Sequence, residues 1–193
     1  FGNIYSRLGN PTVGALEARL TALEEGAMCV ALSSGTSAVM YSLINIMSQG
    51  DNFVTANQLY GGTYTMFDNI LPEYGINSKK VDITDLEAVE AAIDEKTRAI
   101  YCETITNPGL VVADISALAD IAHSKGIPLI VDATFTTSAI LKPFEYGADI
   151  VVYSLTKWMS GHGRVIAGAV IEKGGFDWGN GNFPLYDKPD TSY

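Results

Sequence analysis

The most reactive side chain in the sequence is a lysine that directly follows an apolar, β-branched run. Residues 149–153 have the composition of a buried strand, and Ser154, Thr156 and Lys157 follow its end. A partly desolvated lysine in this position can lose its proton near neutral pH and act as a Schiff-base nucleophile. The two hydroxyl groups can hold a phosphate. The alternative is a solvated lysine that only caps the strand, so the rest of the chain has to supply a site.

Short apolar runs alternate with helical patterns along the whole chain. Strands are expected at residues 28–32, 52–56, 78–81, 98–102, 127–131, 149–153 and 165–171. Asn10 and Pro11 predict the start of a first helix, and Thr84 is expected to cap a helix over residues 85–93. Strand–helix alternation of this length predicts an α/β fold with three layers, α/β/α, around a mostly parallel sheet of about seven strands.

Polar residues collect where the expected strands end. Ligands of open α/β sheets bind beyond the carboxyl ends of the strands. Those ends carry Ser34, Gly35, Thr36, Tyr60, Glu103, Asn107, Asp132, Ser154, Thr156 and Lys157. This set suits pyridoxal phosphate, which needs a lysine amine, a carboxylate on its ring nitrogen, a flat group over the ring and a phosphate cradle.

Each residue has a role in such a site and a plainer alternative. Asp132 would keep the ring nitrogen protonated, or else only cap a turn. Tyr60 would stack on the ring, or else only pack a loop. Gly35 and Thr36 begin a helix whose N–H groups can take the phosphate, although Ser-Ser-Gly alone is a common turn.

Three further residues remain between a chemical and a structural role. Glu103 and Asn107 are balanced between contact with the cofactor and stabilisation of a loop. His162, between two glycines, is interpreted as a structural histidine rather than a base.

Composition excludes several classes of partner and chemistry. A net charge of −10 argues against nucleic-acid and membrane partners, and no apolar run is long enough to span a bilayer. Cys29 and Cys102 lie in apolar runs, which predicts buried free thiols and a cytoplasmic location. Two histidines and two distant cysteines give no zinc spacing, so no metal is expected. The glycine-rich nucleotide motifs and the Gly-x-Ser-x-Gly elbow of hydrolases are missing.

Six segments together resemble the Cys/Met-metabolism family of pyridoxal phosphate enzymes over essentially all 193 residues. They are Tyr5-Ser-Arg7, Ser33-Ser-Gly35, Leu59-Tyr-Gly-Gly-Thr63, Glu103-Thr-Ile-Thr-Asn-Pro108, Val131-Asp-Ala-Thr-Phe135 and Ser154-Leu-Thr-Lys157. The resemblance implies the large domain of fold type I. Within the family, residues 156–163 and 174–184 look like the O-acetylhomoserine sulfhydrylases.

The resemblance implies roles for the residues that match it. Lys157 would carry the cofactor and Asp132 would pair with its ring nitrogen. Tyr60 would stack on the ring and assist the leaving group. The phosphate would be bound by Gly35, Thr36, Ser154 and Thr156, and by Tyr5 and Arg7 of the neighbouring subunit. A site shared in this way implies at least a dimer, and the family is typically a homotetramer.

The resemblance also implies a division of the chain. Residues 1–25 would form an N-terminal arm and first helix, and residues 26–193 the cofactor-binding large domain. The family's C-terminal small domain, with its arginine for the substrate carboxylate, is expected to be absent. Phe1 in place of an initiating methionine agrees with a fragment. Ala133 and Thr36 depart from the residues common in the family, which is expected to alter substrate preference rather than abolish binding.

The reaction implied is a γ-replacement in methionine biosynthesis, from O-acetylhomoserine and sulfide to homocysteine and acetate. A methionine or cystathionine γ-lyase, or a non-catalytic fragment of such an enzyme, is the alternative. The sequence leaves open the acyl group of the ester. It also leaves open whether the sulfur donor is free sulfide or the thiocarboxylate of a sulfur-carrier protein.

Overall fold

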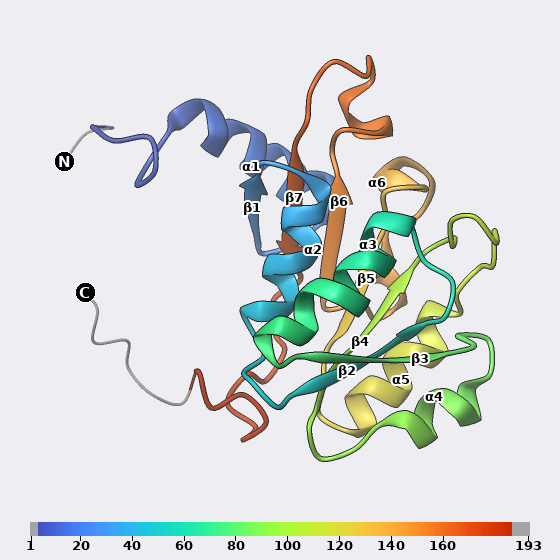
Figure 1. Cartoon of the computed structure of the whole chain (residues 1–193). Coiled ribbons are helices and arrows are strands. Elements are labelled where there is room, and N and C mark those ends of the chain that lie inside the picture. The colour runs from blue at the N-terminus through green and yellow to red at the C-terminus, as the bar shows by residue number, and fades with distance from the viewer. Residues whose placement is uncertain (1–3, 187–193) are drawn as a thin grey trace.

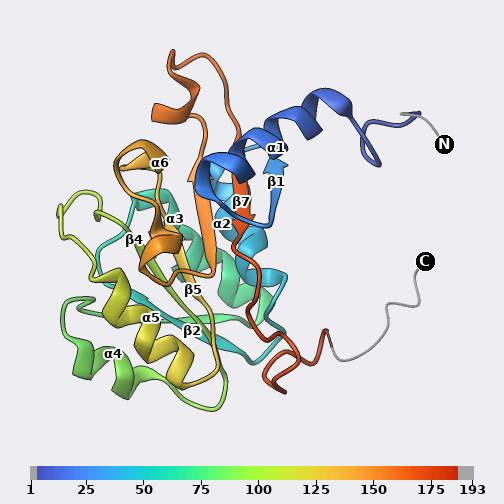
Figure 2. The same ribbon diagram turned by 180° about the vertical axis from the view of Figure 1, so that it is seen from behind.

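The computed structural model describes residues 4–186, which form one mixed sheet with helices on its two faces (Figures 1 and 2). The sheet has seven strands in the order β1-β7-β6-β5-β4-β2-β3. The strands are β1 (Met28–Leu32), β2 (Asn52–Ala56), β3 (Asn77–Val81), β4 (Thr97–Glu103), β5 (Leu129–Asp132), β6 (Ile150–Ser154) and β7 (Gly168–Glu172). Strands β3, β2, β4, β5 and β6 run parallel, whereas β7 is antiparallel to both of its neighbours.

Helices alternate with the strands along the chain, and α1 precedes the first strand. They are α1 (Pro11–Glu24), α2 (Gly35–Ile44), α3 (Gly61–Thr65), α4 (Leu86–Ala92), α5 (Ile115–Ser124) and α6 (Thr137–Ile140). Helices α2 and α3 lie over one face of the sheet, and α4 and α5 lie over the other (Figures 1 and 2). Helix α3 continues into one π-helical turn over Met66–Ile70 and a 3₁₀ turn over Leu71–Tyr74.

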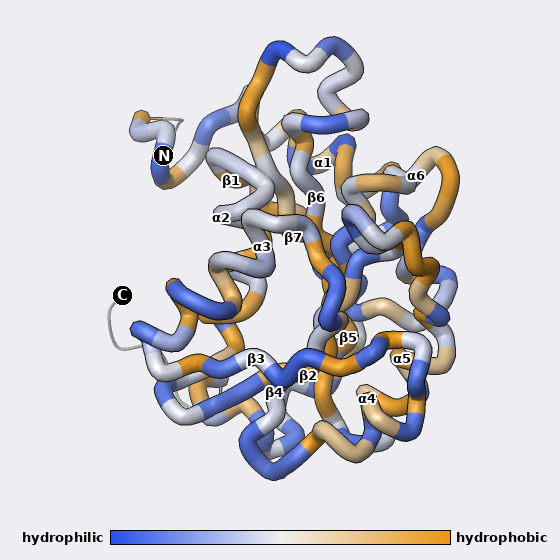
Figure 3. The backbone as a smooth tube through the Cα atoms, turned by 45° about the vertical axis from the view of Figure 1, so that its right-hand side comes forward, coloured by the Kyte–Doolittle hydropathy of each residue, from blue (hydrophilic) through white to orange (hydrophobic). Residues whose placement is uncertain are grey.

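The inner strands of the sheet are more buried than the edge strand β3. Every residue of β2 is buried, and so are nearly all residues of β4, β5 and β6, because helices cover both faces of a parallel sheet. The edge strand β3 instead carries Lys79 and Lys80, and Figure 3 shows hydrophilic residues along this edge. Charged side chains on an edge strand oppose pairing with another chain. No helix within residues 4–186 has the length and hydropathy needed to cross a membrane.

The predicted fold class is confirmed, with two local corrections. The strand expected from Val165 begins only at Gly168, because Val165 and Ile166 are exposed residues of the preceding loop. Asp85, rather than Thr84, caps helix α4, since its carboxylate accepts the N–H of the third helical residue. Residues 187–193 of the tail, and residues 1–3 of the arm, lie outside the described residues.

Helix α1 is fixed at both ends by polar contacts. The Asn10 side chain accepts the N–H groups of Thr12 and Val13, as its predicted role of N-cap requires. At the other end, Glu24 is only 1% exposed, and its carboxyl group accepts a hydrogen bond from the Tyr153 hydroxyl of β6. The second carboxyl oxygen of Glu24 has no hydrogen-bond partner among the described residues. Burial therefore raises the pKa of Glu24.

The start of α2 packs unusually closely on the ends of β6 and β7. A methyl group at Gly35 would lie 2.4 Å from the Cβ atom of Ser154, and one at Gly168 would lie 2.0 Å from the carbonyl oxygen of Ser34. Both contacts are too short for any side chain. Glycine at these two positions therefore lets the first turn of α2 rest directly on the carboxyl end of β6.

Replacement of Glu24 by glutamine should remove one contribution to the pH dependence of the free energy of unfolding. The raised pKa means that the stabilisation from protonated Glu24 is complete below the ordinary value of 4.5 and is lost as the pH rises through the folded-state pKa. Glutamine cannot ionise, so the Glu24→Gln variant should gain stability relative to wild type as the pH rises. Urea unfolding of the complete protein at a series of pH values measures this difference.

The neighbouring residue provides a control of opposite sign. Glu25 is exposed, and its hydrogen bond from Lys142 lowers its pKa. Glu25→Gln should therefore lose stability relative to wild type as the pH rises. Equal slopes for the two variants would contradict the account of Glu24.

Replacement of Gly35 by alanine should destabilise the protein by about 1–3 kcal/mol, because the added methyl group meets the Ser154 backbone and forces α2 or β6 to shift. Gly14→Ala in α1 is the matched control, since its methyl group would have no neighbour within 4 Å. That control should be neutral or stabilising by up to about 1 kcal/mol. Urea unfolding distinguishes the two, and an unchanged Gly35→Ala protein would show that the start of α2 can move freely.

Candidate active site

A cavity of about 710 Å³ lies at the carboxyl edge of the parallel strands. Its volume is in the range typical of small-molecule sites. Ten of the predicted site residues line it: Ser34, Gly35, Thr36, Tyr60, Glu103, Asn107, Asp132, Ser154, Thr156 and Lys157. The loops after β1, β2, β4 and β6 and the last residue of β5 each contribute at least one of them. The structure therefore brings together residues that are up to 123 positions apart in sequence, as the strand-end argument predicts.

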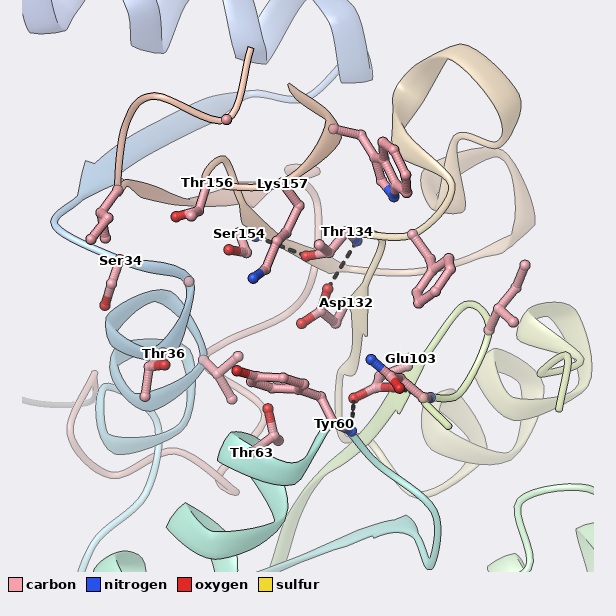
Figure 4. A pocket seen from close by; sticks show the side chains of 18 of the residues that line it. Ser34, Thr36, Tyr60, Thr63, Glu103, Asp132, Thr134, Ser154, Thr156 and Lys157 are labelled. Atoms are coloured by element: carbon pink, nitrogen blue, oxygen red, sulfur yellow. Dashed lines mark hydrogen bonds between the residues drawn. The ribbon is translucent and has the colours of Figure 1, made fainter. Parts of the chain in front are cut away.

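Lys157 projects from the turn after β6 into this cavity, in the direction of Asp132 (Figure 4). The turn continues as a 3₁₀ segment over Trp158–Ser160. Lys157 is an exposed residue of the described chain, and the partial desolvation of its ammonium stays a prediction. What the fold supplies is the position of the amine, opposite a carboxylate.

Asp132 ends β5, and neutral donors hold its carboxylate. One oxygen accepts the N–H of Thr134 at 2.9 Å, and the other accepts the Tyr101 hydroxyl at 3.3 Å. Burial raises the pKa of Asp132, and the hydrogen bonds from Thr134 and Tyr101 act in the opposite direction. A cationic group in the cavity, such as a protonated ring nitrogen, would favour the ionised carboxylate.

Glu103 ends β4 directly beside Asp132, which is its partner in the β4–β5 register. One of its carboxylate oxygens accepts the N–H of Tyr60 at 2.7 Å, and the other accepts the N–H of Asn107 at 3.0 Å. Burial, with a further contribution from the negative charge of Asp132, raises the pKa of Glu103 to about 7, and the two N–H groups act in the opposite direction.

Tyr60 precedes helix α3, and its ring extends across the floor of the cavity beside Thr63 (Figure 4). The residue is 47% exposed, and it lines the cavity. This orientation suits the predicted stacking role.

The start of α2 provides donors for an anion. Ser34 caps the helix by accepting the N–H of Ser37 at 3.0 Å. The N–H groups of Gly35 and Thr36 belong to the first turn, where no helix carbonyl can satisfy them, and the helix dipole favours negative charge there. Ser154 lies against this turn.

Thr156 is less available than predicted. Its hydroxyl donates to the carbonyl oxygen of Ala167 at 3.2 Å and accepts the N–H of the same residue at 3.1 Å. Thr156 lines the cavity but also fixes the approach to β7.

Sequence reasoning missed Thr134 and an apolar part of the wall. The Thr134 hydroxyl accepts the N–H of Ser154 at 2.8 Å while its own N–H binds Asp132, so it connects the ends of β5 and β6. Its position two residues after Asp132 was the available signal. Ile105, Phe135, Trp158 and Ile166 form the apolar wall. His162 is exposed and lies outside the set of residues that line the cavity.

Tyr5 and Arg7 do not lie at this cavity. Both belong to the arm before α1, which extends away from the sheet (Figures 1 and 2). The Arg7 guanidinium lies over the Tyr5 ring, 5.3 Å from its centroid. Their predicted contact with a neighbouring subunit remains a prediction.

The residues present fit pyridoxal phosphate. Lys157 can bond to the aldehyde, Asp132 can pair with the ring nitrogen, Tyr60 can cover one ring face, and the first turn of α2 can bind the phosphate. The close approach that Gly35 permits places that turn beside Ser154, where a larger residue would fill the cradle. Among residues 4–186, no group of three or more His, Cys, Asp or Glu side chains is placed to hold a metal ion.

Two sequence relatives match the entire chain. The O-acetyl-L-homoserine sulfhydrylase of Leptospira meyeri is 46% identical over 193 residues, which are 100% of this chain and 44% of that protein. The homocysteine synthase of Schizosaccharomyces pombe is 45% identical over 195 residues, covering 100% of this chain and 46% of that protein. The chain thus spans less than half the length of these relatives.

Two solved structures share the fold. A putative O-acetylhomoserine (thiol)-lyase from Campylobacter jejuni, solved with N'-pyridoxyl-lysine-5'-monophosphate, superposes with a TM-score of 0.96 at 41% identity, over 100% of this chain and 48% of that one. A cystathionine γ-lyase from Lactobacillus plantarum, complexed with L-serine, gives a TM-score of 0.84 at 42% identity, over 88% of this chain and 44% of that one.

A family model extends the likeness beyond single relatives. The model described as Cys/Met metabolism PLP-dependent enzyme matches residues 1–186, which include every residue of the cavity. With whole-chain relatives above 40% identity, this match confirms the resemblance seen in the sequence motifs. The chain belongs to the Cys/Met-metabolism family of pyridoxal phosphate-dependent enzymes.

Proposed function

We propose that this chain is the cofactor-binding part of an O-acetylhomoserine sulfhydrylase, which converts O-acetyl-L-homoserine and sulfide to L-homocysteine and acetate in methionine biosynthesis. The Cγ–O bond of the ester breaks, a Cγ–S bond forms, and acetate leaves. The observation that carries the proposal is that Lys157 and Asp132 face each other in one cavity beside the first turn of α2. The sulfhydrylases among the relatives support the choice of substrate.

Bound pyridoxal phosphate would supply an electron sink for the carbanion that forms when the substrate loses its Cα proton. Asp132 would hold a proton on the ring nitrogen by its negative charge. Tyr60 would keep the ring flat against the floor of the cavity and assist the leaving group. Ser34, Gly35, Thr36, Ser154 and Thr156 would fix the phosphate end.

Lys157 would perform the proton transfers. Once the substrate amine takes its place on the cofactor, the free Nζ atom can remove a proton from Cα and then one from Cβ. It would return protons after sulfide has added at Cγ. The exposure of Lys157 is compatible with a side chain that moves between these atoms.

The remaining parts of the proposal concern the complete protein. Residues 26–193 would be the large domain, and residues 1–25 would be an arm and first helix whose Tyr5 and Arg7 reach the phosphate in a neighbouring subunit. The active unit would then be a dimer within a homotetramer, located in the cytoplasm. Glu103 and Asn107 would support the same site. Besides the neighbouring subunits, its partners would be the acyl ester and the sulfur donor, whether free sulfide or a carrier thiocarboxylate.

A γ-lyase is the second candidate, because the L. plantarum cystathionine γ-lyase shares the fold at 42% identity. The early proton transfers would be the same. In a lyase the unsaturated product would be released and hydrolysed instead of adding sulfide. The relatives that match the whole chain favour the sulfhydrylase.

The products distinguish the two reactions. The complete protein, loaded with pyridoxal phosphate, should produce homocysteine from O-acetylhomoserine only when sulfide is added. Homocysteine and 2-oxobutyrate would both be quantified, with and without sulfide. Dominant 2-oxobutyrate in the presence of sulfide would instead identify a γ-lyase.

Replacement of Lys157 by alanine should lower kcat by at least about 10³-fold, because the same amine holds the cofactor and moves the protons. Borohydride reduction followed by mass spectrometry should fix the cofactor to Lys157 in wild type and leave the variant unlabelled. Lys125→Ala is the matched control, since that lysine pairs with Glu90 on the surface and should keep full activity. Substantial turnover by Lys157→Ala would exclude the proposed role.

A further inference from the structure

Glu103 lies between the two loops that border the cavity on the side of β4. One loop follows β2 and carries Tyr60, and the other follows β4 and carries Asn107. We propose that Glu103 is a positioning residue whose carboxylate fastens these two loops together and thereby sets the position of the Tyr60 ring. The proposal rests on the cofactor site described above, and it assigns Glu103 a role through the protein backbone rather than through contact with the cofactor.

The hydrogen bonds divide evenly between the loops. Each carboxylate oxygen of Glu103 accepts one backbone N–H, from Tyr60 at 2.7 Å and from Asn107 at 3.0 Å. Figure 4 shows the bond to Tyr60 as a dashed line. The Glu103 residue is 6% exposed, so water competes little for these bonds. Hydrogen bonds to a carboxylate are shorter and stronger than those between neutral groups.

The residue before helix α3 is held by an acceptor from another strand. Tyr60 occupies the N-cap position of α3, and its side chain makes no capping hydrogen bond. A tyrosine ring cannot supply the acceptor that serine or aspartate provides at this position. Glu103, from a different strand, instead fixes the backbone of the cap residue itself. The start of α3 and the root of the Tyr60 side chain are therefore held from β4.

The other loop is a firm support. Residues 105 and 112 form an isolated β-bridge, and the N–H of Thr106 donates to the carbonyl oxygen of Val111 at 2.9 Å. The two loops also touch directly, because a methyl group at Gly109 would lie 1.5 Å from the Gln58 side-chain oxygen. The loop with Asn107 is thus braced internally, and Glu103 joins the Tyr60 loop to it.

The join matters because β4 and β5 are in register. Glu103 is the register partner of Asp132. Its hydrogen bond to the Tyr60 backbone therefore fixes Tyr60 relative to the end of β5, where Asp132 would pair with the ring nitrogen. Loss of either hydrogen bond would let the ring move relative to Asp132. The effect on the cofactor is then indirect, through the stacking surface.

Hydrogen exchange tests this role without substrate. In the complete protein loaded with pyridoxal phosphate, Glu103→Gln offers one amide oxygen in place of two carboxylate oxygens, and its NH₂ group opposes the second N–H. We expect exchange of the amides around Tyr60 and Asn107 to be about tenfold faster or more, with no change in β5 and β6. The dissociation constant of the cofactor should rise by roughly tenfold, measured by equilibrium dialysis.

Asp149→Asn is the matched control. Asp149 is another buried carboxylate that accepts a backbone N–H, from Leu129 at 2.8 Å, and it also binds His123 at 2.9 Å. It precedes β6 at the opposite end of the sheet from the cavity. The same chemical change at that position should lower global stability. The amides around Tyr60 and Asn107 should then exchange no faster, relative to the other amides of the protein, than they do in wild type.

The outcomes separate the alternatives. Weaker cofactor binding with unchanged exchange in both loops would overturn the proposal and make Glu103 a direct ligand. Unchanged exchange and unchanged binding would also overturn it. If Glu103→Gln does not fold, Glu103→Asp, which keeps the charge on a shorter side chain, should speed exchange in at least one of the two loops. These measurements involve no turnover, so an error in the assigned reaction would leave their result intact.

Discussion

Two carboxylates placed side by side at the end of a buried sheet are the constraint on which the site depends. The β4–β5 register puts Glu103 opposite Asp132, and burial raises the pKa of both groups. Two negative charges on adjacent strands repel each other, which is costly unless hydrogen-bond donors or a cation stabilise each of them. Glu103 is compensated by two backbone N–H groups of neighbouring loops. Asp132 is held by Thr134 and Tyr101 and faces the cavity, where a cationic ring nitrogen would complete its compensation.

The two carboxylates thereby have different roles, one structural and one in ligand binding. The one whose partners are all backbone groups organises the walls, and the one that borders the open space is left for the ligand. The opposite side of the cavity follows a different rule, in which close packing replaces charge. Gly35 and Gly168 allow the first turn of α2 to reach the ends of β6 and β7, so that an anion-binding turn lies next to Ser154.

The sequence allowed the strands and the residues at their ends to be predicted, because buried parallel strands are continuous apolar runs and their ends meet at one edge. It did not indicate that β7 runs antiparallel, since β-branched residues favour either direction. The apolar pair Val165 and Ile166 suggested a longer strand, although both residues are exposed and Ile166 belongs to the cavity wall. The partners of Glu103 are backbone N–H groups, which every residue carries, and no sequence pattern could identify them. The exposure of Lys157 likewise depends on how its turn leaves β6.

The strand order has a consequence for the assembly of the protein during its synthesis. Strand β1 pairs with β7 at the margin of the described sheet, and 135 residues separate the end of one from the start of the other. A ribosome therefore releases β1 and the first turn of α2 long before the strand that fixes them has been made. Contacts between distant parts of a chain form late, because closing a long loop loses entropy before the contacts that it allows can stabilise the structure. The phosphate cradle should then be among the last parts to mature, so a nascent chain is expected to acquire its cofactor only after β7 has emerged.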